Sequence, residues 1–438
     1  MAILVNRTYP GPTLYARIGQ RVLIHIINKL PTSSVSYHVH GQHYLGDGAS
    51  GSNNHMDGVP FVTESPIPPM STITYVIEQA YPSGTFYYHS HFPFQITDGV
   101  LGAFIVLDED EEERQQEYDE TEQNGNVDHA VKSPTTTTPI IYDDDTEPIL
   151  ISDWFSTSSN EIFEQIQPLD FNHWPLNHYH SFFNGQTTTM MVRKPTTTTT
   201  NSSNPTSPTI QSQPPKPYFQ TIGPTLLSSS GSSSSSQLRQ QEEQPLVYFS
   251  TPLLCHTTYR LRFIGSTIEF GHRIHLAGHS FDQVVAADGW PVGSSNSSSL
   301  SNSSSFDFLD IYSGERYDVL VTANHPNVCG CGTDTGVTHQ GSTTTNNSTS
   351  SSSFAFELRA WPLTYRGKPV RKSKQQPNVR YASMWIRYKN TTSSSHQQSD
   401  ECAHRHRGTE ATATINSSSS SSIYTTILGT TWTFYSVD

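Results

Sequence analysis

Short runs of alternating or β-branched apolar residues fill the first quarter of the chain. They occupy residues 21–28, 36–41, 71–78, 84–91 and 102–108, and clusters such as "YPGPT" and "SPIPPM" separate them. A period of two is typical of strands that bury one face, and Pro–Gly clusters mark turns. The pattern predicts an antiparallel β-sandwich or barrel. It shows no alternation of strands with helices of the kind that builds a parallel sheet.

A second series of strand-like runs follows an acidic stretch. Its members are residues 148–155, 258–265, 280–289, 315–323, 354–361 and 381–388. Tracts of Ser, Thr and Asn fall between them, and such tracts bury too little apolar surface to offset the entropy lost on ordering. Because doubling a loop costs only about 0.6 kcal/mol, one domain can carry these tracts as insertions.

These patterns divide the chain into four parts. We predict a first β domain over 1–108, an acidic and Thr-rich linker over 109–146, a second β domain with long insertions over 147–390, and a low-complexity tail over 391–438. Within the tail, "IYTTILGTTWTFY" is expected to form at most an isolated hairpin.

Charge and composition narrow the partners. The chain has 438 residues, and 25 basic against 39 acidic residues leave a net charge of −14, which argues against a nucleic acid partner. No apolar run approaches the roughly 18 residues of a membrane helix. Met1 is followed by neither a basic leader nor a cleavage site, so no signal peptide is predicted in this chain. The four cysteines allow three pairings, which leaves the redox compartment open.

Two His-x-His pairs are the chemical signal of the sequence. His38 and His40 flank one valine, and His89 and His91 flank one serine. Alternate residues of a strand face the same way with α-carbons about 6.6 Å apart, so each pair presents two parallel imidazoles. Imidazole suits Zn, Cu, Fe and Ni. Structural histidines on a polar strand face are the alternative, and a zinc hydrolase barrel is another, although the missing β–α alternation counts against it.

The segments around these pairs resemble the multicopper oxidases, the family of laccases, ascorbate oxidases and ferroxidases. The first-domain segments are "VNRTYPGPTLYARIGQRVLIHIIN", "HVHG", "MDGVPFVTESPIPP", "GTFYYHSH" and "TDGVLGAFIV". Those similar to the family's middle domain are "ILISDWF", "FFNGQ", "YRLRFIG", "GHSFDQVVAADGWPV" and "GERYDVLVTA". The resemblance spans most of 3–108 and 148–390. It implies an all-β fold of two tandem cupredoxin-like Greek-key sandwiches with long low-complexity insertions.

The resemblance also implies roles for single residues. His38 matches a ligand of the mononuclear type 2 copper, and His40, His89 and His91 match ligands of the paired type 3 coppers. Asp57 matches a carboxylate that moves protons near the type 2 site, since reducing O₂ to water consumes protons. A turn residue before Gly58 is the alternative interpretation of Asp57.

The family's activity gives the expected function. It is copper-dependent oxidation of a small reducing substrate (a phenol, ascorbate, an amine or Fe²⁺) coupled to reduction of O₂ to water. The implied location is extracellular or in the secretory pathway. The resemblance also implies a disulfide that this chain lacks, because Ser65 stands where the family often has Cys.

Other histidines are interpreted differently. His43 falls where the family has variable side chains. Residues 273–281, "RIHLAGHSF", superficially resemble a third-domain copper motif, but their place before "VVAADG" fits a middle-domain strand with a structural His279. His178 and His180 lie before "FFNG", in a region that matches no copper site.

A complete enzyme of the family has four His-x-His pairs and a blue copper whose Cys lies in a His-Cys-His segment. None of the four cysteines here has that context, and no Met follows Met384. We therefore expect an incomplete chain, truncated at its amino end, whose third cupredoxin domain would complete the cluster, and which is inactive alone. The alternative is a non-catalytic copper-binding or structural protein on a cupredoxin scaffold.

Overall fold

The computed structural model describes most of both predicted domains. The described residues are 2–46, 52–92, 94–108, 142–155, 158–166, 180–191, 218–222, 246–268, 270–292, 305–329, 354–363, 367–368, 381–389 and 430–437. Nearly all regular structure within them is β-strand, as the alternating patterns predict.

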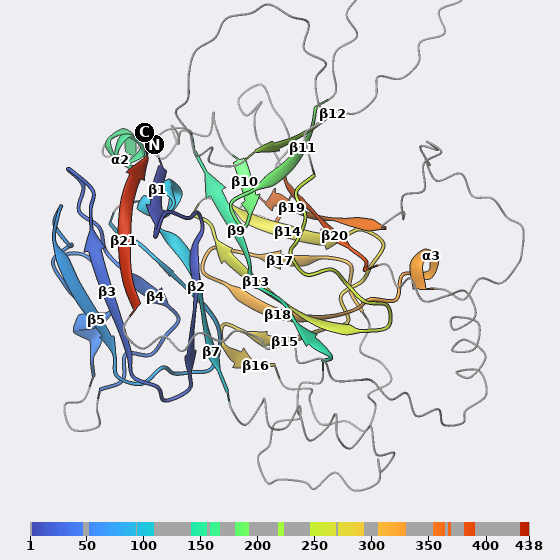
Figure 1. The fold of residues 1–438 in the computed structure, drawn as a ribbon, viewed down its shortest axis with the longest axis horizontal. Helices are drawn as coiled ribbons and strands as arrows, with labels where there is room; N and C mark the ends of the chain where they lie inside the picture. The colour runs from blue at the N-terminus through green and yellow to red at the C-terminus, as the bar shows by residue number, and fades with distance from the viewer. Residues whose placement is uncertain are drawn as a thin grey trace, which may run out of the picture.

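The first domain is a sandwich of two four-stranded sheets (Figure 1). In spatial order, one sheet contains β1 (Ala2–Val5), β21 (Thr430–Val437), β3 (Val22–Asn28) and β5 (Thr72–Ile77). The other contains β2 (Gly11–Arg17), β7 (Leu101–Leu107), β6 (Gly84–His89) and β4 (His38–His40). Their inward side chains, such as Ile24 and Phe104, form one buried core. Two 3₁₀ turns, η1 (Asn54–Met56) and η2 (Gln95–Asp98), follow β4 and β6.

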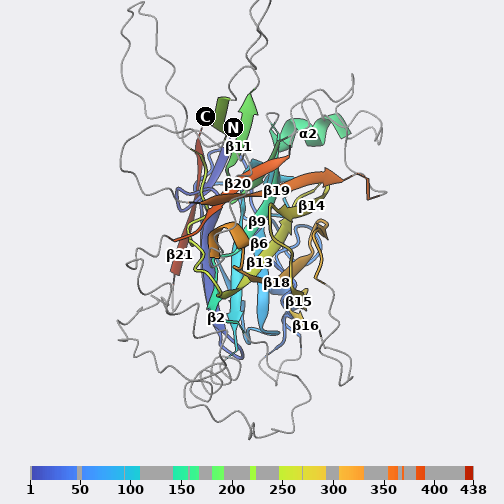
Figure 2. The same cartoon turned by 90° about the vertical axis from the view of Figure 1, so that its right-hand side faces the viewer.

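The second domain packs a seven-stranded sheet against a four-stranded one. The larger sheet contains β10 (His180–Phe183), β9 (Ile149–Trp154), β13 (Thr258–Ser266), β18 (Arg316–Thr322), β15 (Gln283–Ala287) and β16 (Trp290–Pro291), with β8 (Asp144–Asp145) beside β13. The smaller contains β17 (Leu309–Ile311), β14 (Gly271–Leu276), β19 (Ala355–Leu363) and β20 (Ala382–Arg387). In Figure 2, β19 and β20 cross the direction of β9 and β13, and one apolar cluster fills the space between the sheets.

Four short elements complete the described part of the second half. Strands β11 (Thr187–Met191) and β12 (Tyr218–Ile222) pair only with each other, and the helices are α2 (Ser159–Ile166) and α3 (Pro326–Cys329).

The structure corrects the prediction for the end of the chain. Residues 430–437 lie in the part predicted as a tail, yet they form β21, antiparallel to β1 and parallel to β3. Figure 1 shows this strand between β1 and β3, beside the start of the chain. The segment is rich in Thr and aromatic residues, which favour strands, but its partners lie some 400 residues earlier. Local pattern cannot reveal so distant a pairing, and the predicted isolated hairpin is wrong for these residues.

The strand directions also differ from a purely antiparallel prediction. β2 pairs with β7 in parallel, and β13 pairs in parallel with both β8 and β9. The sheets are open, so the architecture is a sandwich and not a barrel. Parallel neighbours need long connections, and alternation within each strand carries no information about them.

A buried network of charges joins the domains. Thr85 on β6 donates its hydroxyl proton to Asp318 on β18, with 2.6 Å between the oxygens. Arg260 and Arg262 on β13 bind the other oxygen of the same carboxylate at 2.7 and 3.1 Å. All three charged side chains are at most 5% exposed. The contact therefore fixes β6, which ends at His89, against the second domain.

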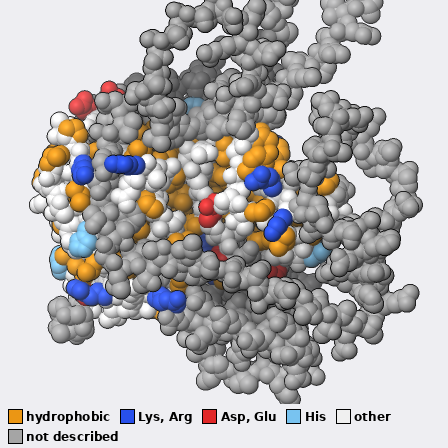
Figure 3. Space-filling model, in the orientation of Figure 1, with side chains coloured by type: hydrophobic (Ala, Val, Ile, Leu, Met, Phe, Trp, Pro, Cys, Tyr) orange, Lys and Arg blue, Asp and Glu red, His pale blue; other side chains and the backbone are white. Residues whose placement is uncertain are grey.

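A disulfide joins Cys255 to Cys329, one of the pairings that the sequence left open. Cys331 and Cys402 lie outside the described residues. Of the helices described, none has the length and apolar character to cross a membrane. On the face drawn in Figure 3, the described Lys and Arg side chains stand singly among apolar and uncharged ones.

Candidate metal centre

Two adjacent strands bring the histidine pairs together. β4 and β6 are antiparallel neighbours, and His38 stands directly opposite His89. His40 is opposite Tyr87, and His91 follows the end of β6. Since alternate residues of a strand share a face, both members of the first pair and His89 project to the same side.

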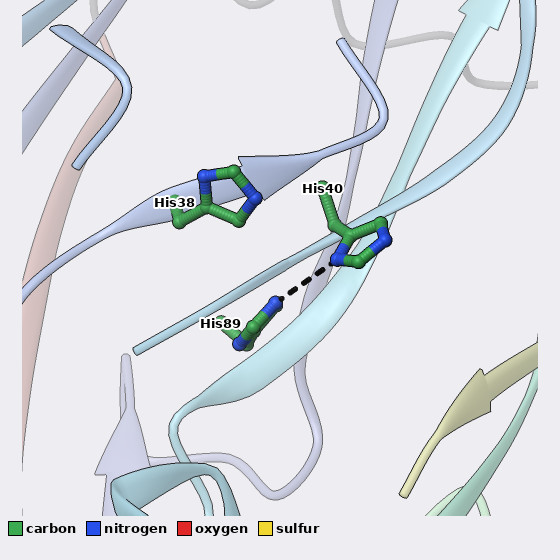
Figure 4. Close-up of side chains that lie close together, drawn as sticks. All are labelled: His38, His40 and His89. Atoms are coloured by element: carbon green, nitrogen blue, oxygen red, sulfur yellow. Dashed lines mark hydrogen bonds between the residues drawn. The ribbon is translucent and has the colours of Figure 1, made fainter. Parts of the chain in front are cut away.

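The four imidazoles form one compact group. The ring centroid of His38 lies 5.6 Å from that of His40, 5.4 Å from that of His89 and 4.8 Å from that of His91. One ring nitrogen from each of His38, His40 and His89 lies within 4.8 Å of the others. Figure 4 shows these three rings, with Nδ1 of His40 3.4 Å from Nε2 of His89. His91 joins by ring contact, 4.7 Å from His89, although its nitrogens are not among the three.

Backbone carbonyls set the tautomers of two rings. Nδ1–H of His38 donates to the carbonyl oxygen of Asp57 at 2.7 Å, and Nδ1–H of His89 donates to that of Ser90 at 3.3 Å. In a neutral imidazole the other nitrogen then carries the lone pair. Both Nε2 atoms are therefore available to a cation, and ligand histidines commonly donate their second N–H in this way.

Burial and neighbouring positive charge favour the neutral form of His40, His89 and His91. Burial, followed by the positive charge of Arg316 and the neighbouring imidazoles, lowers the pKa of His40 to about 3. Burial, followed by the other three histidines, holds the pKa of His89 well below its usual value. Burial and His38 likewise lower the pKa of His91. Neutral imidazole is the form that binds metals, so the donor set fits a borderline cation such as copper.

Asp57 lies between this group and solvent. Its Oδ1 is 3.0 Å from Nδ1 of His38. It also lines an open cleft of about 580 Å³ together with Gln42, His43, Tyr44, Leu45, Ser52, Asn54 and Thr63. Gly58 follows in the left-handed conformation, with φ of 76°, as a turn requires. A carboxylate that contacts both a ring nitrogen and water can exchange protons, and the turn interpretation holds for its backbone.

Sequence reasoning missed the residues that support the rings. Tyr87 stacks on His40 and His89 with centroids 4.9 and 4.8 Å away, and its hydroxyl lies 3.4 Å from Nδ1 of His40. It precedes His89 by two residues on one strand, so alternation could have indicated it. Gly314 and Arg316 of the second domain also reach this region, and no local pattern points to them.

The other histidines lie apart from this group. His43 contacts Tyr81 and Trp290, with ring centroids 5.6 and 6.0 Å away. His279 uses both ring nitrogens, toward Tyr388 Oη at 2.6 Å and the carbonyl oxygen of Ala277 at 3.1 Å. His180 stacks near Phe182, and His178 lies outside the described residues. Within the described ranges, His38, His40 and His89 are the single group of three or more potential ligands.

The fold and the group together define a class: a double β-sandwich protein with a cluster of potential metal-ligating histidines at a strand pair of its first domain. Comparison with known families then identifies the chain. Residues 1–111 match one family model described as multicopper oxidase, and residues 145–329 match a second with the same description. These matches cover more than half of the chain, which therefore belongs to the multicopper oxidase family, and its two sandwiches are cupredoxin domains.

The chain matches individual relatives over part of their length. Over 118 residues the chain is 38% identical to Laccase-1 of Cryptococcus neoformans var. grubii, a match of 27% of this chain and 18% of that protein. It is 38% identical over 107 residues to the iron transport multicopper oxidase FET3 of Saccharomyces cerevisiae, which covers 24% of this chain and 16% of the relative. The crystal structure of laccase from Botrytis aclada superposes with a TM-score of 0.51 at 22% identity, covering 90% of this chain and 50% of the laccase. The chain thus spans about half the length of that laccase.

Proposed function

We propose that His38, His40, His89 and His91 hold copper and form part of the centre at which an oxidase of this family reduces dioxygen. In this proposal His38 serves a type 2 copper, and the other three serve the type 3 pair. The observation that carries it is the convergence of three imidazole nitrogens, one from each of His38, His40 and His89, within 4.8 Å of one another. Copper bound there would supply the electron transfers that reduce dioxygen to water.

The chain's own residues have separate tasks in this proposal. Asp57 holds Nδ1 of His38 and faces the open cleft, so it passes protons between solvent and the centre. Tyr87 packs on the rings of His40 and His89 and restricts their rotation. The low pKa of the half-buried His40 keeps it a ligand at neutral pH, because no proton competes with the metal there.

The described residues supply only part of an oxidase. Cys255 and Cys329 are joined to each other, so neither offers the thiolate that a blue copper needs. We infer that further copper ligands come from polypeptide outside the described residues, in a third cupredoxin domain. The reducing substrate is a phenol, ascorbate, an amine or Fe²⁺.

The disulfide also bears on location. Such bonds persist mainly in oxidising compartments, so the bond between Cys255 and Cys329 supports the secretory pathway or the cell exterior. The same engaged cysteines support the second candidate, a copper-binding scaffold without turnover. Transcript sequence downstream of residue 390 separates the two, because an in-frame His-Cys-His segment would establish the oxidase.

The copper proposal is tested by electron paramagnetic resonance on the copper-loaded full chain. We expect a Cu²⁺ signal with nitrogen hyperfine structure that His40→Ala alters, without intense blue colour and without O₂ uptake in the presence of a phenol or Fe²⁺. A signal identical in wild type and His40→Ala would remove these histidines from the proposal. An intensely blue sample would show that the chain holds a thiolate copper site after all.

A further inference from the structure

The second domain touches the ring of His40. Gly314 lies in the turn before β18, and a β-carbon built on it would stand 3.0 Å from both Cε1 and Nε2 of His40. Because ordinary β-carbon contacts are wider than this, the bare backbone of Gly314 lies directly against one edge of the imidazole. The other ring nitrogen, Nδ1, lies 3.4 Å from Nε2 of His89. One side of this proposed ligand is therefore bounded by the other domain.

Arg316 fixes that turn in place. Its Nη1 donates to the carbonyl oxygen of Gly314 at 2.7 Å, and its Nε donates to the carbonyl oxygen of Thr85 on β6 at 3.2 Å. Its side chain is 5% exposed, and Nη1 also pairs with Asp288 Oδ1 at 3.1 Å. The guanidinium carbon lies 5.4 Å from the ring centroid of Phe86. One planar group thus binds the turn of the second domain and the strand that carries His89.

The same guanidinium packs against the residue that follows His40. A β-carbon on Gly41 would stand 2.3 Å from Nη2 of Arg316, so only glycine leaves room for it. Gly41 also has a φ of 89°, in the region that favours glycine. His40 is consequently held from two sides, by Gly314 at its ring and by Arg316 at the backbone that follows it.

We propose that Arg316 is a positioning residue for copper, which clamps the turn at Gly314 against His40 so that Nδ1 of His40 stays aimed at the ring nitrogen of His89. This inference rests on the proposed function. It makes copper affinity in the first domain depend on a side chain of the second. Residues that orient metal ligands typically change metal affinity by about 10–100-fold. Because Arg316 acts through packing and not through a bond to the imidazole, we expect about a tenfold loss.

The test measures copper affinity of the full chain by competition with a chelator of known affinity. Arg316→Met removes the directional donors at similar length, and Arg316→Lys keeps the charge without the fork that binds two carbonyls. Both variants should bind copper about tenfold more weakly than wild type. Arg273→Met is the matched control, because Arg273 is also paired with a carboxylate, Asp310, but on β14 and β17 of the smaller sheet of the second domain. It should bind copper as wild type does.

Two further measurements separate positioning from general damage. In a His40→Ala background, Arg316→Met should cause no further loss, because the residue acts through that ring. In metal-free protein, the ring ¹⁵N shifts of His40 should change in Arg316→Met and stay constant in Arg273→Met. If Arg316→Met does not fold, Arg316→Lys carries the same comparisons.

The outcomes distinguish this inference from the function on which it rests. Wild-type chain that binds no copper contradicts the proposed function. Wild-type chain that loses affinity through His40→Ala, while folded Arg316→Met and Arg316→Lys keep it, overturns the role of Arg316 alone. If Arg316→Met weakens copper binding equally in the wild-type and His40→Ala backgrounds, the role of Arg316 is also overturned, because its effect then does not pass through the ring of His40.

Discussion

Asp318→Asn removes a carboxylate that two buried guanidinium groups share at the domain junction. The carboxylate binds Arg260 at 2.7 Å and Arg262 at 3.1 Å, and it accepts the hydroxyl proton of Thr85 at 2.6 Å. In the variant these two arginines keep their charge, and Asp145 still pairs with Arg262 at 2.6 Å. The two buried cations then lose the negative charge that they share.

The size of the effect follows from burial. Asp318 and Arg260 are 1% and 3% exposed, and removing one member of a fully buried pair typically costs about 3–5 kcal/mol. The same substitution at Asp310, whose pair with Arg273 is about one-third exposed on both sides, should cost at most about 1 kcal/mol. The substitution is chemically the same at both positions. The difference between the two losses of unfolding free energy therefore measures the contribution of the buried network.

The assay is urea unfolding at pH 7, followed by tryptophan fluorescence and circular dichroism. Burial would raise the pKa of Asp318, but the charges of Arg260 and Arg262 outweigh it and hold the pKa below the usual value. The carboxylate therefore contributes fully above the unfolded-state pKa, and its contribution is lost as pH falls through the lower folded-state value. The gap between wild type and Asp318→Asn should narrow in acid below about pH 4. A cost at pH 7 equal to that of Asp310→Asn would refute the reasoning.

Three further changes have definite expected outcomes. Gly58→Ala should destabilise the chain far more than Gly19→Ala in urea unfolding, because both have φ near 75° but only at Gly58 would the new β-carbon lie 1.9 Å from a backbone oxygen, that of Tyr37; equal costs would mean that the turn beside the histidines is not tight. Burial lowers the pKa of His272 to about 3, so the unfolded chain binds an extra proton from about pH 6.5 down to that value, and stability falls with pH across this window. Between pH 6.5 and pH 5, the unfolding free energy of His272→Gln should therefore fall by roughly 1.5 kcal/mol less than that of wild type in the same assay. An equal fall in both proteins would assign the acid response to other groups. Cys255→Ser opens a bridge between residues 74 positions apart and should lower the unfolding free energy by about 4 kcal/mol, whereas a wild type indifferent to reductant would mean that the bridge does not form.

Much of the fold could be predicted because each strand has its own local pattern of apolar residues in the sequence. The runs at 84–91 and 258–265 coincide closely with β6 and β13, where apolar side chains occupy buried positions. Which strands pair with one another, and in which register, is not visible in any local pattern. Pairing of β21 with β1 and β3, and of β9 with β13 in parallel, depends on chain segments far apart in the sequence.

The same division holds for the candidate metal centre. The spacing of His38 and His40 indicates that both face the same side of a strand. Antiparallel pairing of that strand with β6 then places His89 opposite His38. The residues that pack against these rings could not be predicted from local sequence in the same way. Gly314 reaches His40 only because two domains pack together, and a glycine 274 positions away in the sequence carries no sign of that contact.

Calorimetric titration of the chain with copper tests whether the two His-x-His pairs bind metal. We expect about one or two ions per chain, because the coppers of the proposed centre would lack the ligands that a third domain supplies. His38→Ala and His89→Ala should each abolish most of this binding, and His279→Ala should leave it intact, since both nitrogens of that ring are already bonded within the second domain. Equal loss from all three variants would mean adventitious binding by the chain's many histidines. Undiminished binding in His38→Ala and His89→Ala would contradict the account, because the metal would then lie elsewhere.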